Sequence, residues 1–511
     1  MPPSLTPDPA PSAELAVRLD TALPASLPVG RGTAVFCSGA CVHSREPIRA
    51  LEITVDGERH LPTALRMPRL DLYELSKGDA RWYRSGFWAT VPIGARERPG
   101  AAELSLRARL AGDRELVAPI GRIEIVDPER RSSYQEPSVC GAHDLIAVCM
   151  ATFDPDMRLF REQIESLRAQ TDRDWVCLIS DDCSPPERFA EITAAVAGDP
   201  RFVISRSERT LGPYRNFERA LEMVPDAAGL VALCDQDDRW YPEKLSVLRG
   251  ALGSAQLVYS DLRLVDAEGR VLRDTLWSGR RNNHTDLASL LIANSVTGAA
   301  ALFRRELAEL ARPFPDPPGL QLHDHWIALV ALATGDIAYV DRPLYDYVQH
   351  ERAVLGRAPE PVNRPRPAGV SRLPGLRALR RSLGGGRAAY FYGYLPRAVL
   401  AQALLVRCQG SVAAPKRRVL ERFLAGADRP LAFAWLAARP LRRLVGANET
   451  LGTEAELARG IVWRHLAEAL VVGRRVPGPL PVEAACPPLD VETLGQRRLA
   501  RWRAATSAPL T

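Results

Sequence analysis

Three carboxylates follow an apolar run near the middle of the chain. The run Leu230 to Cys234 has the composition of a buried strand, and Asp235-Gln236-Asp237-Asp238 comes directly after it. Three acids within four residues repel one another, so a buried strand end is unfavourable for them unless a cation neutralises the charge. We therefore expect a divalent metal at this cluster. A solvated turn at the strand end is the alternative for such a motif taken alone.

Alternating strand and helix patterns surround the acid cluster. Strands are expected at 145–153, 175–180 and 202–205, and helices at 157–169, 189–197 and 217–223. This alternation predicts an α/β domain, Rossmann-like, with a mostly parallel sheet covered by helices. Such sheets bind ligands at the carboxyl ends of their strands. Both Asp181-Asp182 and the acid cluster lie at such ends.

Seven short motifs stand in order over roughly residues 144–358, about two fifths of the chain. They are Met150-Ala151-Thr152-Phe153, Ser180-Asp181-Asp182-Cys183-Ser184, Gly212 with Asn216-Phe217, Asp235-Gln236-Asp237-Asp238-Arg239-Trp240, Asn294-Ser295-Val296-Thr297-Gly298, His323-Asp324-His325-Trp326 and Tyr347-Val348-Gln349-His350. On these motifs the chain resembles the family-2 inverting glycosyltransferases of GT-A fold, and more narrowly their rhamnosyltransferase-like branch. It departs from the family at Cys183, usually Gly, at Thr210, usually Asn, and in the segment after His350.

The resemblance implies a metal site and a donor site. The leaving diphosphate of a nucleotide-sugar is neutralised by Mg²⁺ or Mn²⁺, held by one or two carboxylates and the phosphates. Asp237, helped by Asp235 or Asp238, would hold that metal. His350 would reach the metal or the diphosphate, although a lone histidine is more often structural. Nucleotide-sugar contacts are implied for Thr152, Phe153, Asp182, Gly212, Asn216, Asp235 and Gln236.

Two acids in these motifs are given individual roles by the resemblance. Asp182 would accept a hydrogen bond from the uracil or thymine ring of the donor, with Phe153 near the base. Asp324, which precedes the apolar helix expected at 326–333, would be the base that takes the proton of the acceptor hydroxyl. The alternatives are structural: an N-cap or Asx-turn for Asp181-Asp182, and an N-cap for Asp324.

Changes in texture divide the 511 residues further. Between Thr33 and Val126, short alternating segments and the hairpin signal Asp56-Gly57 predict an immunoglobulin-like β-sandwich. After Gly356 the chain becomes rich in Pro and Arg, and helices are expected at 388–406 and 455–472. The predicted division is a disordered tail (1–12), a β-sandwich accessory domain (13–130), a linker (131–143), the glycosyltransferase domain (144–358), a Pro/Arg/Gly-rich linker (359–385) and a basic helical region (386–511).

Two groups of side chains in the expected sandwich admit a second interpretation. Four aromatic residues, Trp82, Tyr83, Phe87 and Trp88, could form a carbohydrate platform, although filling of the sandwich core is the more common role. Cys37, Cys41 and His43 have a loose metal-like spacing. No second ligand pair follows them, which favours buried, reduced thiols.

Charge is distributed unevenly along the chain. Residues 361–511 carry 25 Arg and Lys against 9 Asp and Glu, whereas residues 1–360 carry 42 against 52. A basic region of this kind could bind anionic lipid, and a helical domain with a solvated basic face is the alternative. No nucleic-acid-binding motif accompanies the charge, which argues against nucleic acid. The sequence contains neither a signal-like segment nor a long apolar run, so we expect a cytoplasmic protein with peripheral contact at the inner face of the membrane.

These observations together predict an inverting, metal-dependent glycosyltransferase. Its donor would be a dTDP-, UDP- or GDP-sugar, with rhamnose among the candidate sugars. Its acceptor would be a glycan or a polyprenyl-linked glycan in bacterial-type cell-surface polysaccharide synthesis. The alternative is a non-catalytic glycan-binding or scaffold protein that keeps the shape of a GT-A domain. A sugar-nucleotidyltransferase would want a glycine-rich basic loop after the first strand, and the sequence has none.

Overall fold

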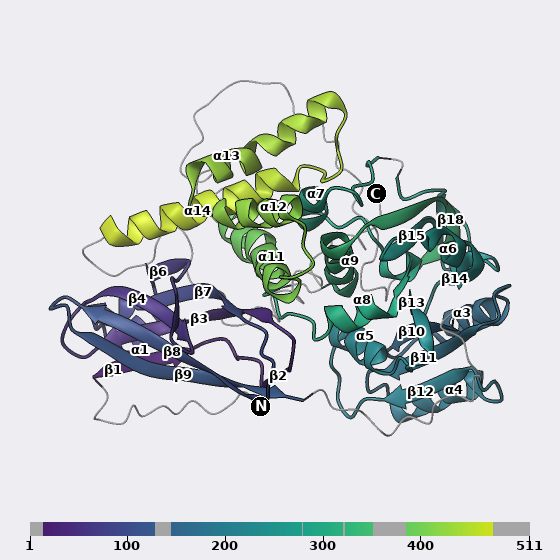
Figure 1. The fold of residues 1–511 in the computed structure, drawn as a ribbon, viewed down its shortest axis with the longest axis horizontal. Coiled ribbons are helices and arrows are strands. Elements are labelled where there is room, and N and C mark those ends of the chain that lie inside the picture. The colour runs from purple at the N-terminus through teal and green to yellow at the C-terminus, as the bar shows by residue number, and fades with distance from the viewer. Residues whose placement is uncertain (1–13, 128–144, 278, 320–321, 351–384, 474–511) are drawn as a thin grey trace, which may run out of the picture.

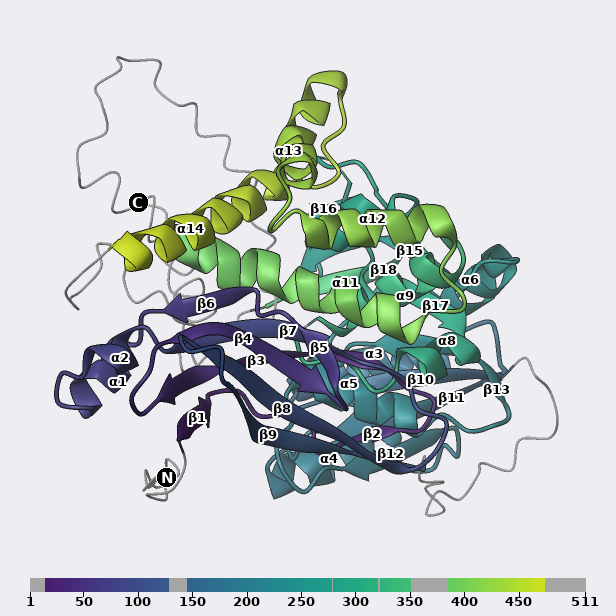
Figure 2. The ribbon, with the colours of Figure 1, turned by 60° about the vertical axis from the view of Figure 1, so that its left-hand side comes forward.

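The computed structural model describes residues 14–127, 145–277, 279–319, 322–350 and 385–473. The predicted tail at 1–12, the predicted linker at 131–143 and nearly all of the one predicted at 359–385 lie outside these residues. Figure 1 shows the chain coloured from its start to its end, and Figure 2 shows it turned by 60°.

The first part of the chain forms two β-sheets around a shared apolar core. One sheet has the order β1 (Leu15–Leu19), β3 (Thr33–His43), β7 (Gly86–Ile93), β6 (Ala64–Met67), and the other has the order β2 (Ser26–Pro28), β9 (Glu115–Val126), β8 (Gly100–Leu110), β4 (Ile48–Val55), β5 (Glu58–His60). Two short helices, α1 (Leu70–Leu75) and α2 (Ala80–Tyr83), connect β6 to β7. Along β8, alternate residues from Ala102 to Leu110 are fully buried, as the alternating sequence predicts.

The aromatic side chains of this region fill cores. Tyr83, Phe87 and Trp88 are at most 2% exposed, so the carbohydrate platform is wrong for these three. The Trp88 ring lies 5.3 Å from the ring of Phe391 in the C-terminal helices. Cys37 and Cys41 are also buried, and burial raises the pKa of both thiols to about 12, which keeps them protonated.

The middle of the chain forms a nine-stranded sheet covered by helices. The strand order is β12 (Phe202–Arg206), β11 (Trp175–Asp181), β10 (Leu145–Thr152), β13 (Ala228–Cys234), β17 (Ala301–Arg304), β15 (Leu257–Asp266), β18 (Ile337–Gln349), β14 (Arg239–Trp240), with β16 (Val271–Arg273) paired to β15. The strands from β12 to β13 run parallel, as predicted, whereas β17 runs antiparallel to both of its neighbours. The predicted α/β class is therefore confirmed, with a mixed second half of the sheet.

The four helices predicted in this domain form within four residues of their expected bounds, as α3 (Met157–Arg168), α4 (Pro186–Val196), α5 (Pro213–Glu222) and α9 (His323–Thr334). The structure adds α6 (Lys244–Leu252), α7 (Leu287–Ile292), α8 (Arg305–Ala311) and a 3₁₀ turn η1 (Gly298–Ala300), which the sequence patterns did not predict. At α3, the Asp156 carboxylate accepts the backbone N–H groups of Arg158 and Leu159, which satisfies donors that a helix start leaves free.

The C-terminal helices lie between the sandwich and the α/β domain. They are a π-helical turn η2 (Ala389–Tyr394), α11 (Leu395–Arg407), α12 (Ala414–Ala425), α13 (Pro430–Ala438), a 3₁₀ segment η3 (Arg439–Val445) and α14 (Thr453–Gly473). In Figure 2, α11 runs over the strands of the sandwich and past α9. Every residue of β3 is buried, because the sandwich core covers one face of the strand and α11 of the C-terminal helices packs against the strand.

Arginines of the C-terminal helices donate hydrogen bonds to the sandwich and to the α/β domain. The Arg407 guanidinium donates to the carbonyl of Gly32 at 2.5 Å, and to carbonyls between Leu310 and Pro313 at 2.9–3.1 Å. Arg464 donates to the carbonyl of Thr63 in the sandwich. Part of the basic charge of the C-terminal region is therefore buried and structural. Among the described residues, no helix has both the length and the apolar character needed to cross a membrane.

Candidate active site

The carboxyl ends of three parallel strands meet at one edge of the sheet. Thr152 pairs in register with Asp181, and Met150 pairs with Cys234, so β10, β11 and β13 end at nearly the same level. The sequence placed both acid motifs at such ends, and the sheet topology brings them together.

A buried hydrogen-bond network supports this edge. The Asn216 side chain accepts from the Ser180 hydroxyl at 2.6 Å and donates to the carbonyls of Ser180 and Thr152 at 2.9 and 3.2 Å. The Thr152 hydroxyl donates to the Asp181 carboxylate, which also accepts the N–H and hydroxyl of Ser184. Asn216, Thr152 and Asp181 are at most 1% exposed. These side chains hold the strand ends to α5, which is a structural role for Asn216 and Thr152 beneath the expected donor site.

Asp182 and Gly212 join the strand edge to the loop before α5. The two carboxylate oxygens of Asp182 accept the backbone N–H groups of Leu211 and Gly212 at 2.6 and 2.8 Å, and Asp182 is 2% exposed. Gly212 has a φ of 84°, a left-handed conformation that glycine adopts without steric cost. In this structure the expected base-binding acid orders the loop around the donor site, and its contact with a base stays a prediction.

Phe153 is the exposed aromatic side chain at this edge. Its side chain is 50% exposed, while its backbone N–H and carbonyl pair with the Gln236 amide at 2.9 and 3.3 Å. Gln236 therefore ties the end of β10 to the acid cluster after β13. An exposed ring held by a fixed backbone is well suited to stack on a flat base.

The acid cluster is crowded with negative charge. Burial, together with the charges of Asp237 and Asp324, raises the pKa of Asp235 to about 7. The pKa of Asp238 is raised well above its usual range by burial and by its two neighbouring acids. One oxygen of Asp238 accepts the Val348 N–H, and the other is buried with no hydrogen-bond partner among the described residues. A cation would relieve each of these costs.

The Asp237 and His350 side chains face each other at the rim of the cluster. Asp237 Oδ2 lies 2.7 Å from His350 Nε2, and the two side chains are 19% and 13% exposed. A carboxylate and an imidazole at this spacing are two ligands that a divalent metal accepts. No group of three His, Cys, Asp or Glu side chains arranged to hold a metal occurs among the described residues. Asp237 and His350 are thus the two side chains at this rim whose chemistry suits a divalent cation.

Asp324 lies in the first turn of α9, and its charge acts on Asp235 of the acid cluster. The Asp324 carboxylate accepts the backbone N–H of His325 at 2.6 Å. Burial raises the pKa of Asp324 to about 6, which the N–H groups of His325 and Gly298 oppose. Leu322, rather than Asp324, stands at the N-cap of the helix. Gly298 belongs to the motif at 294–298, and a Cβ there would lie 3.4 Å from Asp324 Cβ.

The histidines beside Asp324 have structural contacts. The His323 ring stacks on Phe217 with centroids 3.7 Å apart, and His325 Nε2 lies 2.8 Å from the Leu290 carbonyl oxygen. Burial lowers the pKa of each imidazole to about 3, so both rings are neutral near pH 7. They fix α9 against α5 and α7, and so position Asp324.

Two site residues escaped the sequence-based assignment. Lys244 is fully buried behind the acids, donates to the Ala299 carbonyl at 2.5 Å, and has a pKa lowered by burial to about 7. Burial raises the pKa of Tyr347 well above its usual range, and the charges of Asp235, Asp238, Asp237 and Asp324 act in the same direction. The signal for Lys244 was a lysine on the apolar face of a short helix just after the cluster.

Substitutions of Asn216 and Phe153 test which residue supports the fold and which contacts the nucleotide. Asn216→Ala should lower the free energy of unfolding by about 1–3 kcal/mol, because it leaves Ser180 and Thr152 groups buried without partners. Phe153→Ala should leave stability nearly unchanged and cost about 1–3 kcal/mol of nucleotide binding if the ring stacks on a base. Urea unfolding and calorimetric titration measure the two quantities. The reverse pattern would make Asn216 a ligand contact and Phe153 a support.

Comparisons with known proteins give a family match for the first part of this domain and two relatives. Residues 148–310 match the family model described as glycosyl transferase family 2. Over 121 residues the chain is 31% identical to the uncharacterized protein y4gI of Sinorhizobium fredii, covering 23% of this chain and 13% of that protein. Over 135 residues it is 27% identical to an uncharacterized glycosyltransferase of Methanocaldococcus jannaschii, covering 25% and 46%. The chain thus spans less than half the length of either relative.

Solved structures resemble the chain more distantly. TarS of S. aureus, residues 1–349 in complex with UDP-GlcNAc, matches with a TM-score of 0.36 and 14% identity, covering 66% of this chain and 95% of that one. A mannosyltransferase of Pyrobaculum calidifontis in complex with GDP-Man and Mn²⁺ matches with a TM-score of 0.32 and 17% identity, covering 64% and 86%. The parallel strand ends and the family match thus agree that residues 148–310 are similar to a glycosyltransferase family 2 domain.

Proposed function

We propose that this protein is an inverting, metal-dependent glycosyltransferase of GT-A type, which uses a nucleotide-diphosphate sugar as its donor. The observation that carries the proposal is the position of Asp324. It comes from a different part of the sequence than Asp235 and Asp237, yet a Cβ at Gly298 would lie 3.4 Å from Asp324 Cβ and 3.5 Å from Leu233 of β13, the strand that leads into the acid cluster. A base beside a diphosphate site is the arrangement that an inverting transfer requires.

Nucleotide binding and proton acceptance would be carried out by different groups of residues around the acid cluster. On one side, Phe153 would stack on the base and the loop held by Asp182 would enclose the nucleotide. On the other side, Asp324 would accept the proton of an acceptor hydroxyl while the oxygen of that hydroxyl forms a bond to the anomeric carbon of the donor sugar. The bond from that carbon to the diphosphate oxygen breaks on the opposite face, so the anomeric configuration inverts.

A divalent cation, Mg²⁺ or Mn²⁺, would be held by Asp237 and His350 with oxygens of the donor, and it would supply charge neutralisation for the leaving diphosphate. Asp235 and Asp238 would add negative charge beside it, and Lys244 would offset part of that charge when protonated. His323 and His325, both neutral, would hold Asp324 in place without competing for the proton. Tyr347 would keep its phenolic proton and could donate a hydrogen bond into the cluster.

Stabilisation of the protein by donor candidates tests this function most directly. Thermal unfolding would be followed with dTDP-, UDP- and GDP-sugars, each with and without Mn²⁺. A ligand at about a hundredfold excess over its Kd should stabilise the folded state by about 2.7 kcal/mol. We expect one nucleotide class to stabilise the protein only with the metal, and to be hydrolysed slowly when no acceptor is present.

The same screen separates the enzyme from its alternative. A non-catalytic glycan-binding or scaffold protein would bind glycans without a metal-dependent response to any nucleotide-sugar. Rhamnose as the transferred sugar, and a glycan or polyprenyl-linked glycan as the acceptor in cell-surface polysaccharide synthesis, remain parts of the proposal that rest on the sequence motifs. The nucleotide class found in the screen would decide which donors to assay with such acceptors.

A further inference from the structure

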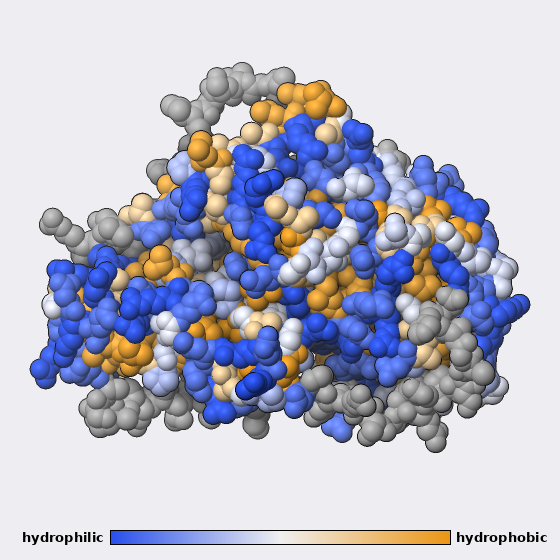
Figure 3. Space-filling model, viewed as in Figure 1, coloured by the Kyte–Doolittle hydropathy of each residue, from blue (hydrophilic) through white to orange (hydrophobic). Residues whose placement is uncertain are grey.

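A ridge of apolar side chains projects from the C-terminal helices. It consists of the exposed residues Leu431, Ala434, Ala437, Ala438, Leu441, Leu444 and Val445, from α13 and η3. Leu431, Leu444 and Val445 are 80–85% exposed. Figure 3 shows this apolar ridge as orange residues at the top of the molecule, where Figure 1 places α13. Soluble surfaces seldom gather apolar side chains in this way without a partner.

Helix α13 is apolar on both of its faces. Ala432 and Leu436 are buried on one face, while Leu431, Ala434 and Ala438 follow a spacing of three and four residues on the other. Leu441, Leu444 and Val445 continue the exposed apolar surface along η3. Arg439, by contrast, is 9% exposed and lies 3.7 Å from the Asp286 carboxylate.

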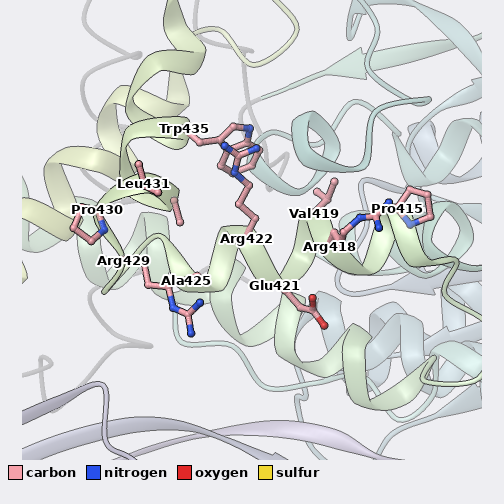
Figure 4. Close-up of a pocket in the computed structure, with 11 residues that line it drawn as sticks. Pro415, Arg418, Val419, Glu421, Arg422, Ala425, Arg429, Pro430, Leu431 and Trp435 are labelled. Atoms are coloured by element: carbon pink, nitrogen blue, oxygen red, sulfur yellow. The ribbon is translucent and has the colours of Figure 1, made fainter.

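Arginines border the apolar ridge. Arg418, Arg422, Arg429 and Arg443 are all exposed, and α13 itself contains no charged residue. A groove of about 940 Å³ between α12 and α13 runs beside the apolar ridge, and the first three of these arginines line it together with Leu431 and Trp435. Figure 4 shows the Arg422 side chain reaching the Trp435 ring, and the guanidinium lies 4.9 Å from the ring centroid.

We propose that the apolar ridge and its arginines bind the surface of a bilayer that contains anionic phospholipid. Exposed leucines on one helical face can enter the boundary between headgroups and acyl chains, while flanking guanidinium groups meet the phosphates. Charge complementarity decides between this occupant and a second copy of the chain. Two copies meeting through the same face would bring the arginines of both together, and like charges repel.

Bonds to the α/β domain orient the apolar ridge relative to the site. Arg442 reaches the Asp286 carboxylate at 3.3 Å, and Asp286 caps α7 by accepting the N–H groups of Ala288 and Ser289. The Asn448 side chain accepts from the Arg281 N–H at 2.9 Å. Helix α7 leads directly to the motif at 294–298 that contacts Asp324. A bilayer bound at the apolar ridge would thus be connected, through Arg442 and α7, to the part of the domain that holds Asp324.

Flotation of the full chain with vesicles tests the proposal. One set of vesicles contains phosphatidylcholine alone, and the other contains about a quarter phosphatidylglycerol. We expect the protein to float with the second set only, and to be released as salt rises, because the Debye length falls from about 10 Å at 0.1 M to about 3 Å at 1 M. Equal recovery with both sets would overturn the proposal.

Matched variants assign the binding to the apolar ridge. Leu441→Glu/Leu444→Glu/Val445→Glu should lose flotation, whereas Leu61→Glu/Leu75→Glu, which alters leucines 77% and 70% exposed in the sandwich, should float like the native chain. Arg418→Glu/Arg443→Glu should weaken binding at least about 25-fold, or fivefold for each arginine, and Arg109→Glu in the sandwich should not. The arginine pair keeps the test valid if the triple variant unfolds.

A measurement without vesicles tests whether a second copy of the chain, instead of a bilayer, binds the apolar ridge. Should the native chain form a dimer that the triple variant abolishes, and should neither protein float, the apolar ridge would be an interface between copies of the chain. If the triple variant floated as well as the native chain, the assignment of membrane binding to the apolar ridge would also be overturned. Sedimentation equilibrium at several protein concentrations supplies the oligomeric state.

Discussion

Replacing Asp324 by Asn should abolish sugar transfer while donor binding stays nearly unchanged. Asn keeps the shape of the side chain and can still accept the His325 N–H, but it cannot take a proton. General-base catalysis contributes about 10²–10⁴-fold, so we expect turnover to fall by that factor with little change in donor affinity. Steady-state kinetics and calorimetric titration of the donor measure the two effects.

The pH profile adds a second readout for Asp324. Because burial raises its pKa to about 6, the carboxyl group is protonated below that pH and cannot act as a base. Native transfer should therefore decline as pH falls through about 6, and the residual rate of Asp324→Asn should not follow that decline. Asp336→Asn, an exposed acid just beyond the end of α9, is the control. Near-normal transfer by a folded Asp324→Asn would make this acid structural.

Replacing Asp237 by Ala should remove metal-dependent donor binding and leave the fold intact. Loss of groups that only support a metal ligand costs about 10–100-fold in affinity, so loss of a direct ligand should cost at least about 100-fold. Stability should hardly change without metal, because the variant removes one of several acids that repel one another. Titration of the donor nucleotide with and without Mn²⁺ measures the effect.

The control for Asp237 is an acid of the same domain outside the cluster. Asp226 is 91% exposed at its side chain and pairs with Arg305, so Asp226→Ala should bind donor and metal like the native protein. His350→Ala should weaken the response to Mn²⁺ in the same direction as Asp237→Ala, since the two side chains lie 2.7 Å apart. Unchanged Mn²⁺-dependent binding in Asp237→Ala would refute the metal assignment.

Local patterns determined the α/β domain and the positions of its motifs. Apolar runs such as Leu145–Thr152 and Ala228–Cys234 form buried parallel strands, and the residues after them must lie at the carboxyl edge of the sheet. The sequence could therefore place Asp182, Asp235 and Asp237 at one edge. The direction in which each side chain points was a separate question, because burial and hydrogen bonding depend on neighbours distant in the chain. For this reason the sequence predicted nucleotide-sugar contacts for Asn216 and Thr152, whereas in the structure their side chains form hydrogen bonds that hold the strand ends.

The tertiary structure decided the placement of everything outside that edge. Sequence periodicity predicted C-terminal helices, but it carried no sign that α11 would cover β3 or that Arg407 would donate to carbonyls of two domains. Likewise, apolar residues at helical spacing usually indicate a buried face, and only the packing of α13 and η3 leaves Leu431 and Leu441 exposed. A single segment dictates its own period and polarity, whereas the surface it meets is supplied by other segments of the chain.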